Sequence, residues 1–327
     1  MKVFVTGATG FIGSKLVERL AEEGHEVHAL YRSEKKLPST VPRNVIFFKG
    51  DITDPESLKK AMQGCEVVFH VAAFAGIWLR DTEVIYRLNV TSAVGLLQMA
   101  SVMGVRRCVV TSSAAVFGPS RGALVDESTP FPETYFTHYE HSKAMLEKEI
   151  DRLLAGGHDI VVVNPTRVYG PGPLNESNSV TKLVMDYTRG KWRLLPGNGE
   201  GTGNYVFIDD VTRGHLLAME KGRTGERYIL GGENASYTKL FDLAGELNGK
   251  KYRMMKMPLW LMMAVAWITT GMTRMFGAKP FITPGLVRKY HCHWMNSSVK
   301  AMRELGYNPV SLAEGLQHTI RWIKTQR

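Results

Sequence analysis

The sequence predicts an α/β fold: a doubly wound parallel sheet with a smaller, discontinuous second domain towards the C-terminus. In the N-terminal half, short apolar runs alternate with segments of helical periodicity. Continuous apolar strands separated by helices indicate a parallel sheet that is covered on both faces. A glycine-rich turn between the first strand and the first helix supports this arrangement, because such turns open the phosphate-binding helix of doubly wound folds.

The elements of the N-terminal half follow in a regular order. The apolar runs predict strands at 2–7, 26–32, 44–51, 65–73, 106–118 and 159–172. Helical periodicity and end signals predict helices at 14–24, 53–64, 81–104 and 139–154. Leu16, Val17 and Leu20 share one face of the first helix, and Gly24 ends it. Pro55 suits the first turn of the second helix.

Composition indicates a folded globular protein in a reducing setting. Hydrophobic residues make up 44% of the 327 residues. Cys65, Cys108 and Cys292 are odd in number and far apart, which predicts reduced thiols and a cytoplasmic location. The N-terminus enters a strand-like run at once, so we expect no signal peptide.

The positive charge is concentrated near the C-terminus. Residues 250–327 hold 13 Lys/Arg and 2 Asp/Glu, whereas residues 1–249 hold 28 and 29. The excess predicts either a solvated basic face or attraction to an anionic membrane surface or substrate. We expect no nucleic-acid binding, because the sequence has no zinc-finger spacing, helix-turn-helix pattern or aromatic stacking motif.

The glycine-rich turn reads "TGATGFIG" and predicts a dinucleotide site. A loop without Cβ atoms lets backbone amides approach a pyrophosphate, which then lies at the N-terminus of the following helix. The strand before it and the helix after it give the motif the context it needs. The expected contacts are Thr6, Gly7, Thr9, Gly10, Phe11, Ile12 and Gly13.

The end of the second strand favours NADP(H), with NAD(H) as the alternative. An NAD site usually holds a carboxylate there for the ribose 2′-hydroxyl. This sequence instead has Tyr31 and Arg32, and a guanidinium binds a 2′-phosphate well. Arg32 stacked on the adenine is the other interpretation. Asp51 and Ile52, after the third strand, are expected beside the adenine ring.

Three polar residues predict a proton-transfer centre. Tyr139 and Lys143 are four residues apart in a predicted helix, so they share one face. A free phenol is ionised in only about one molecule in a thousand at pH 7. An adjacent ammonium and a positively charged nicotinamide would lower its pKa. Ser113, at the end of the fifth strand, lies at the edge where such sheets bind ligands.

Ordered motifs over residues 3–211 resemble the extended short-chain dehydrogenase/reductase superfamily. The chain is most similar to its dihydroflavonol reductase-like and hydroxysteroid dehydrogenase-like branch. The motifs are "TGATGFIG", "GDITD", "HVAA", "NVTSAVGLL", "TSSAAVFG", "YEHSK", "NPTRVYGPG" and "YVFIDDV".

The resemblance implies a role for each matching residue. Tyr139 would be the general acid/base, Lys143 would lower its pKa and hold the nicotinamide ribose, and Ser113 would bond the substrate oxygen. Ser112 is the less favoured partner, and Asn89 would support the catalytic site. Further cofactor contacts implied by the resemblance are Ala72, Ala73, Pro165, Thr166 and Val168.

The leading functional hypothesis is an NADP(H)-dependent enzyme that interconverts a ketone and a secondary alcohol on a bulky hydrophobic substrate. A sugar-nucleotide epimerase or dehydratase with tightly held NAD is the first alternative. Phe117 and the segment 291–298 depart from the pattern of those enzymes. A non-catalytic cofactor sensor or lipid-binding protein is the second. We expect no metal, because His291 and His293 lack a third ligand at supporting spacing.

The expected domains are a Rossmann-like dinucleotide-binding part and a substrate-binding cap. The first comprises 1–171 plus about 205–231, and the second about 172–204 plus 232–327. The resemblance also suggests a homodimer formed through the helices at 81–104 and 139–154.

One cap segment, 257–273, has no charged residue. It predicts a helix that lines an apolar pocket or lies on anionic headgroups, and the two are compatible. A membrane span is least favoured at this length. A peripheral membrane contact through 250–279, at the inner face of the membrane, is therefore expected alongside the small hydrophobic substrate.

Overall fold

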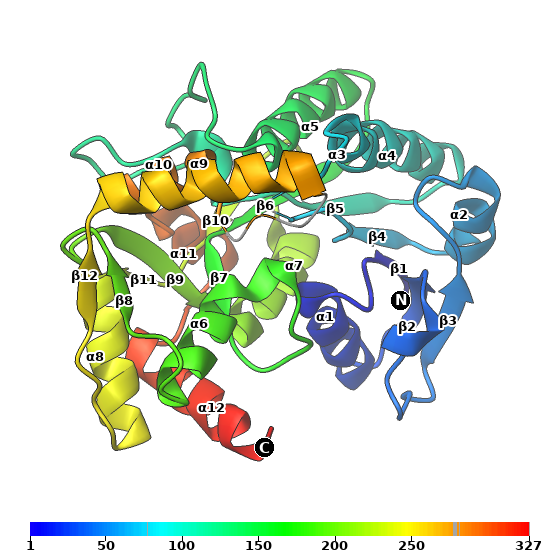
Figure 1. The fold of residues 1–327 in the computed structure, drawn as a ribbon. Coiled ribbons are helices and arrows are strands. Elements are labelled where there is room, and N and C mark those ends of the chain that lie inside the picture. The colour runs from blue at the N-terminus through cyan, green and yellow to red at the C-terminus, as the bar shows by residue number, and fades with distance from the viewer. Residues whose placement is uncertain (77, 277–279, 281, 327) are drawn as a thin grey trace.

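The computed structural model describes residues 1–76, 78–276, 280 and 282–326. A seven-stranded parallel sheet forms its centre, in the order β10-β6-β5-β4-β1-β2-β3 (Figure 1). The predicted doubly wound α/β class is therefore confirmed. The central strands are β1 (Lys2–Thr6), β2 (Glu26–Tyr31), β3 (Val45–Lys49), β4 (Val67–His70), β5 (Arg107–Thr111), β6 (Ile160–Pro165) and β10 (Arg227–Leu230).

Helices cover both faces of this sheet (Figure 1). Side chains alternate along each strand, so Val3 and Val5 of β1 pack on one side and Phe4 on the other. The first side is covered by α1 (Phe11–Glu22), α7 (Ile208–Lys221) and α11 (Val299–Leu305). The second is covered by α2 (Pro55–Met62), α4 (Ser92–Val102) and α5 (His138–Ala155).

A second, three-stranded sheet has the order β11-β9-β7. It consists of β7 (Arg167–Tyr169), β9 (Thr202–Phe207) and β11 (Glu233–Ser236). Its core packs against α6 (Ser179–Thr188), α8 (Tyr237–Asn248) and α12 (Leu312–Thr325). The short strands β8 (Leu194–Pro196) and β12 (Met255–Met257) pair in parallel, and β12 is followed by α9 (Leu259–Phe276) and α10 (Pro284–His291). The expected domain boundaries stay a prediction.

The local end signals act as the sequence suggests. Asp54 caps α2 by accepting a hydrogen bond from the Glu56 amide, and Pro55 occupies the first turn. Thr137 caps α5 by accepting from the Glu140 amide. These caps fix where each helix starts, and the α5 cap thereby places Tyr139 in the first turn.

Three predicted elements differ in detail. The strand expected over 106–118 ends at Thr111, because the Ser113 hydroxyl accepts from the Ala115 amide and caps a 3₁₀ turn (Ala114–Phe117). The helix expected over 81–104 is α3 (Glu83–Tyr86), a π-helical turn (Arg87–Thr91) and α4. The strand expected over 159–172 divides at Thr166 into β6 and β7, which belong to different sheets.

Two glycines are required by close backbone approach in the turn between β1 and α1. Gly7 has φ +70°, and a Cβ there would lie 2.7 Å from the Ala72 backbone nitrogen. A Cβ on Gly13 would lie 2.1 Å from the Gly7 carbonyl oxygen. Neither position accepts a side chain without displacing the backbone.

We expect Gly13→Ala to lower the free energy of unfolding by roughly 1–3 kcal/mol, because the added methyl group forces the turn apart. Gly95→Ala is the matched control. Nothing lies within 4 Å of a Cβ at this helical position, so we expect a gain of about 0.5–1 kcal/mol. Urea unfolding would measure both. Equal stability of the two variants would contradict the close packing of this turn.

Candidate active site

A cavity of about 1080 Å³ runs along the C-terminal edge of the central sheet. It extends from the glycine turn past the end of β5 to the segments that follow β7. Of the predicted site residues, all but Thr6 and Asn89 line it: Gly7, Thr9, Gly10, Phe11, Ile12, Gly13, Arg32, Asp51, Ile52, Ala72, Ala73, Ser113, Tyr139, Lys143, Pro165, Thr166 and Val168.

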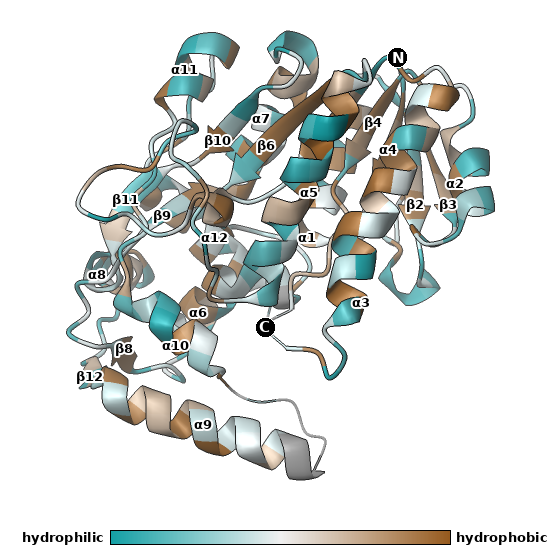
Figure 2. Cartoon of the chain, turned by 90° about the horizontal axis from the view of Figure 1, so that it is seen from above, coloured by the Kyte–Doolittle hydropathy of each residue, from teal (hydrophilic) through white to brown (hydrophobic). Residues whose placement is uncertain are grey.

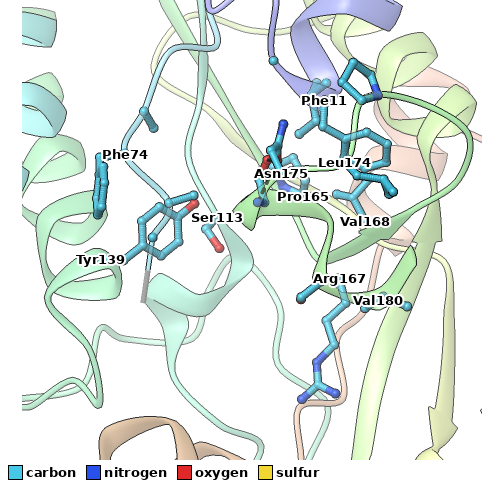
Figure 3. Close-up of a pocket in the computed structure, with 18 of the residues that line it drawn as sticks. Phe11, Phe74, Ser113, Tyr139, Pro165, Arg167, Val168, Leu174, Asn175 and Val180 are labelled. Carbon is cyan, nitrogen blue, oxygen red and sulfur yellow. Dashed lines mark hydrogen bonds between the residues drawn. The ribbon is translucent and has the colours of Figure 1, made fainter. Parts of the chain in front are cut away.

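Ser113 and Tyr139 lie side by side in the cavity (Figure 3). Ser113 lies shortly after the end of β5, and Tyr139 lies in the first turn of α5. Phe74, which also lines the cavity, lies on the side of Tyr139 away from Ser113 (Figure 3). Ser112 also lines the cavity but is only 4% exposed. Ser113 and Tyr139 thus place two hydroxyl groups next to each other in the cavity.

Burial holds Tyr139 in its protonated form. It raises the pKa of the phenol to about 12, with the hydrogen bond of Ser113 opposing the rise and the charge of Glu140 adding to it. From the sequence, Lys143 and a charged nicotinamide are expected to lower the pKa of this phenol. In the protein alone, desolvation of the phenolate is the larger effect. A protonated Tyr139 is the form that can donate to a carbonyl oxygen.

Lys143 is buried behind the cavity wall at 1% exposure. Its Nζ donates a 2.7 Å hydrogen bond to the Thr111 carbonyl oxygen at the end of β5. Burial lowers the pKa of Lys143 to about 8, and the charge of Glu147 opposes that fall. Its ammonium form is therefore present at neutral pH and lost at moderately alkaline pH.

These two groups set an expected pH dependence for carbonyl reduction. We expect kcat/KM to be level near neutral pH and to fall above about pH 8, where Lys143 loses its charge. Tyr139 does not cause this fall, because its own pKa is about 12. Alcohol oxidation needs Tyr139 deprotonated while Lys143 is still charged. Its rate should therefore rise with pH and level off above about pH 8, where the loss of the Lys143 charge offsets further ionisation of Tyr139. A pH–rate profile in both directions measures this, and two profiles of the same shape would be incompatible with it.

Glu147, one turn beyond Lys143 on α5, is a polar residue that the motif does not include. It is fully buried, and burial raises the pKa of its carboxyl group. Its two oxygens accept 2.7 Å hydrogen bonds from Asn164 and from Arg227. Glu147 lies four residues after Lys143, and this helical spacing is the sequence signal that could have identified it.

Thr6 and Asn89 support the cavity from behind. The Thr6 hydroxyl shares a 2.9 Å hydrogen bond with His70 and accepts one from the Ala72 amide. Asn89 accepts from the Phe74 amide at 2.7 Å and donates to its carbonyl oxygen at 3.0 Å. Both side chains act on the site through the backbone that follows β4, so we give Asn89 a positioning role.

The residues at the glycine turn fit a dinucleotide. α1 begins at Phe11 with no side-chain cap, which leaves its first amides available to an anion. Gly7 and Gly13 allow the close backbone approach that shapes this turn. The first amides of α1 could therefore hold a pyrophosphate.

The far end of the cavity is basic. Arg32, Lys35 and Lys36 line it together with Ser33. Arg32 is 75% exposed, and its Nη1 lies 3.6 Å from an Asp51 carboxylate oxygen. This long, exposed contact leaves the guanidinium able to reach a bound phosphate.

Comparisons with known proteins agree with this geometry. Residues 3–231 match the model of the NAD dependent epimerase/dehydratase family. A Synechocystis protein provisionally named dihydroflavonol 4-reductase is 33% identical, over 98% of this chain and 94% of its own. Sterol demethylase protein B of Methylococcus capsulatus is 31% identical, over 99% and 98%.

Solved structures give the same fold. A dTDP-glucose 4,6-dehydratase from Streptomyces venezuelae, solved with NAD bound, superposes with a TM-score of 0.81 at 26% identity, over 100% of this chain and 98% of its own. The chain belongs to the NAD-dependent epimerase/dehydratase family and is an NAD(P)-dependent oxidoreductase of the extended short-chain dehydrogenase/reductase type.

Proposed function

We propose that the protein interconverts a ketone and a secondary alcohol on a bulky hydrophobic substrate, with NADP(H) as the cofactor. The observation that carries this proposal is the pair of hydroxyls, Ser113 and Tyr139, at one end of a largely apolar chamber. The chamber walls beyond them include Val180, Leu183, Trp192, Leu194, Leu195, Leu240, Phe241, Met257, Met262, Val265, Ile282 and Leu286.

A bound nicotinamide would supply a hydride to the carbonyl carbon, and the chain would supply the proton. Ser113 orients the carbonyl oxygen by hydrogen bonding, and Tyr139 donates its phenolic proton as negative charge develops there. Lys143 stabilises the resulting phenolate. The ketone gains one hydride and one proton, and the reverse sequence oxidises the alcohol. The apolar walls exclude water from the reacting atoms.

The lining of the basic end supports the cofactor preference. Arg32, Lys35 and Lys36 offer three cations where the adenosine 2′-phosphate of NADP(H) would lie. Asp51 is the only carboxylate among the described residues that line this part of the cavity, and Arg32 already faces it.

A sugar-nucleotide epimerase or dehydratase is the second candidate, favoured by the matched family and by the dehydratase of the same fold. Native mass spectrometry of purified protein, followed by an NADPH-oxidation screen over steroid-like, flavonoid-like and long-chain ketones, separates the two. The proposal expects NADPH oxidation with at least one ketone. Stoichiometric retained NAD without any NADPH oxidation would assign the second candidate instead.

A further inference from the structure

A cation lies in the wall of the cavity, away from the reacting hydroxyls. Arg167 opens β7, and its side chain points away from Ser113 and Tyr139 (Figure 3). Its Nη1 donates to the Tyr237 hydroxyl at 2.9 Å and to the Tyr205 hydroxyl at 3.4 Å. Both rings lie against it, with Cζ 5.4 and 5.6 Å from their centroids. Hydroxyls and ring faces thus hold the guanidinium in place.

No carboxylate in the described part of the chain lies within ion-pair distance of Arg167. Lys289, the other cation on this side of the cavity, is paired with Glu140 at 2.7 Å. Only Nη1 of Arg167 has hydrogen-bond partners among the described residues. Its remaining N–H groups and its net charge are therefore available to a ligand.

The absence of a side chain at Gly203 leaves room for the Arg167 guanidinium. A Cβ on Gly203 of β9 would lie 2.5 Å from Nη1 and 2.6 Å from Cζ of Arg167. The neighbouring strand thus has its glycine where the guanidinium lies. An arginine fork binds a carboxylate through two parallel hydrogen bonds, and the gain is large where water is excluded.

We propose that Arg167 binds an anionic group, a carboxylate, on the hydrophobic substrate. This rests on the proposed function, because Ser113 and Tyr139 then hold the carbonyl while Arg167 holds the acid. The substrate class is an oxo acid, or the matching hydroxy acid, with a large apolar body against the α8 and α9 walls.

Calorimetry with unreactive probes tests the subsite without turnover. Octanoate and octanamide have the same chain and nearly the same shape, but only octanoate is charged and has two acceptor oxygens. Each is titrated into protein saturated with NADP⁺. We expect octanoate to bind roughly 10-fold or more tightly than octanamide. Arg167→Gln should abolish the preference, and Arg167→Lys should keep part of it. Arg189→Gln, which removes a cation outside the cavity, is the control and should leave the preference unchanged. Equal binding of the two probes to the wild type overturns the subsite.

A turnover arm separates this proposal from the proposed function. A long-chain 3-oxo acid and its methyl ester are compared by NADPH oxidation. Arg167→Gln should raise KM for the acid about 10-fold or more and leave the ester unaffected. Reduction of neither compound, with the octanoate preference intact, counts against the reductase and supports the anion subsite. Reduction of both with equal KM in wild type and variant refutes the subsite and keeps the reductase.

A second, independent observation concerns α9, which forms a rod at the edge of the molecule (Figure 2). One face packs inward: Met262 and Ala266 are buried against Ile282 and Val287. Over residues 259–273, whose side chains the structure describes, the opposite face is exposed and carries no charge. Its members recur at helical spacing and are Trp260, Leu261, Ala264, Trp267, Ile268, Gly271 and Met272. We call this set the α9 stripe.

The α9 stripe has the chemistry of a membrane-interface helix. Trp260 is 72% exposed and Trp267 57%, and tryptophan favours the boundary between headgroups and acyl chains. Arg253 and Lys256, just before the helix, are exposed cations. A second copy of this chain would bring like charges together, whereas an anionic bilayer complements them.

The geometry points to docking of the α9 stripe on an anionic lipid surface. No described helix meets the length and hydropathy of a membrane crossing, so the contact is along the helix. The inward residues Met262 and Val265 line the cavity. α9 therefore separates the substrate chamber from the lipid by one helix. Residues 277–279, at the end of the segment expected to touch membrane, lie outside the described residues.

Vesicle co-sedimentation tests this second proposal. We expect binding to vesicles of phosphatidylcholine with phosphatidylglycerol, weaker binding to phosphatidylcholine alone, and weakening by salt. The double variant Trp260→Ala/Trp267→Ala should bind roughly 10-fold or more weakly. Val102→Ala/Val299→Ala, which trims two exposed apolar side chains elsewhere, is the matched control and should bind as the wild type. No binding to anionic vesicles, or a dimer that the tryptophan variant dissociates, overturns lipid docking.

Discussion

Tyr139→Phe should lower kcat roughly 10²- to 10⁴-fold while leaving NADPH affinity nearly unchanged. The substitution removes a single oxygen atom. The remaining ring keeps its place beside Ser113 (Figure 3), and we expect Ser113 still to bond the carbonyl oxygen. What is lost is the only proton that the site, as we propose it, can deliver to the developing alkoxide.

Steady-state NADPH oxidation and fluorescence titration of NADPH measure the two quantities. Tyr135→Phe is the matched control, because Tyr135 lies just before α5 and its hydroxyl donates to the Val116 carbonyl oxygen. It is not among the residues that line the cavity. We expect the control to keep kcat within a few-fold of the wild type. A Tyr139→Phe enzyme with comparable turnover would exclude the proposed proton transfer.

Arg32→Asp should weaken NADPH binding roughly 10- to 100-fold and affect NADH far less. The variant replaces an attraction to the 2′-phosphate with a repulsion, and it adds a second carboxylate beside Asp51. NADH carries no phosphate at that position. Its ribose 2′-hydroxyl can instead donate a hydrogen bond to the new carboxylate.

The measurement is the ratio of kcat/KM for the two cofactors, in wild type and variant. Arg43→Asp makes the same change of charge at an exposed residue that does not line the cavity, so it should leave the ratio unchanged. Equal losses for NADPH and NADH in Arg32→Asp would argue that Arg32 stacks on the adenine instead of binding a phosphate.

The sequence was sufficient to predict the features that depend on residues close together in the chain. The strand–glycine–helix turn and the four-residue step from Tyr139 to Lys143 depend on neighbours in the chain, so their geometry follows from periodicity. The same holds for Pro55, which occupies the first turn of α2 as expected. Ser113 could be placed because parallel strands end at a common edge.

The remaining features depend on contacts between distant segments. Thr6 belongs to the glycine motif in the sequence and is expected to contact the cofactor. Its hydroxyl instead forms a hydrogen bond with His70 of β4. Arg167 lies within a loop motif whose pattern gives no sign of a special role. Its surroundings are visible only in the folded protein, where Tyr205 of β9 and Tyr237 of α8 enclose it and no carboxylate of the described residues pairs with it. The sequence shows that 257–273 is apolar but not which of its residues are buried. The fold distinguishes a face that packs against α10 from a face that is exposed.

The division of one expected strand at Thr166 has an evolutionary consequence. Pro165 ends a strand of the large sheet and Arg167 begins a strand of the small one. In the function we propose, cofactor handling and recognition of the remainder of the substrate are thus adjacent in the chain but belong to separate sheets. An exchange of the residue at position 167 would then change which ligand chemistry is accepted and leave β6, which ends at Pro165, in place. Such partial independence lets one scaffold diversify into many specificities by small steps.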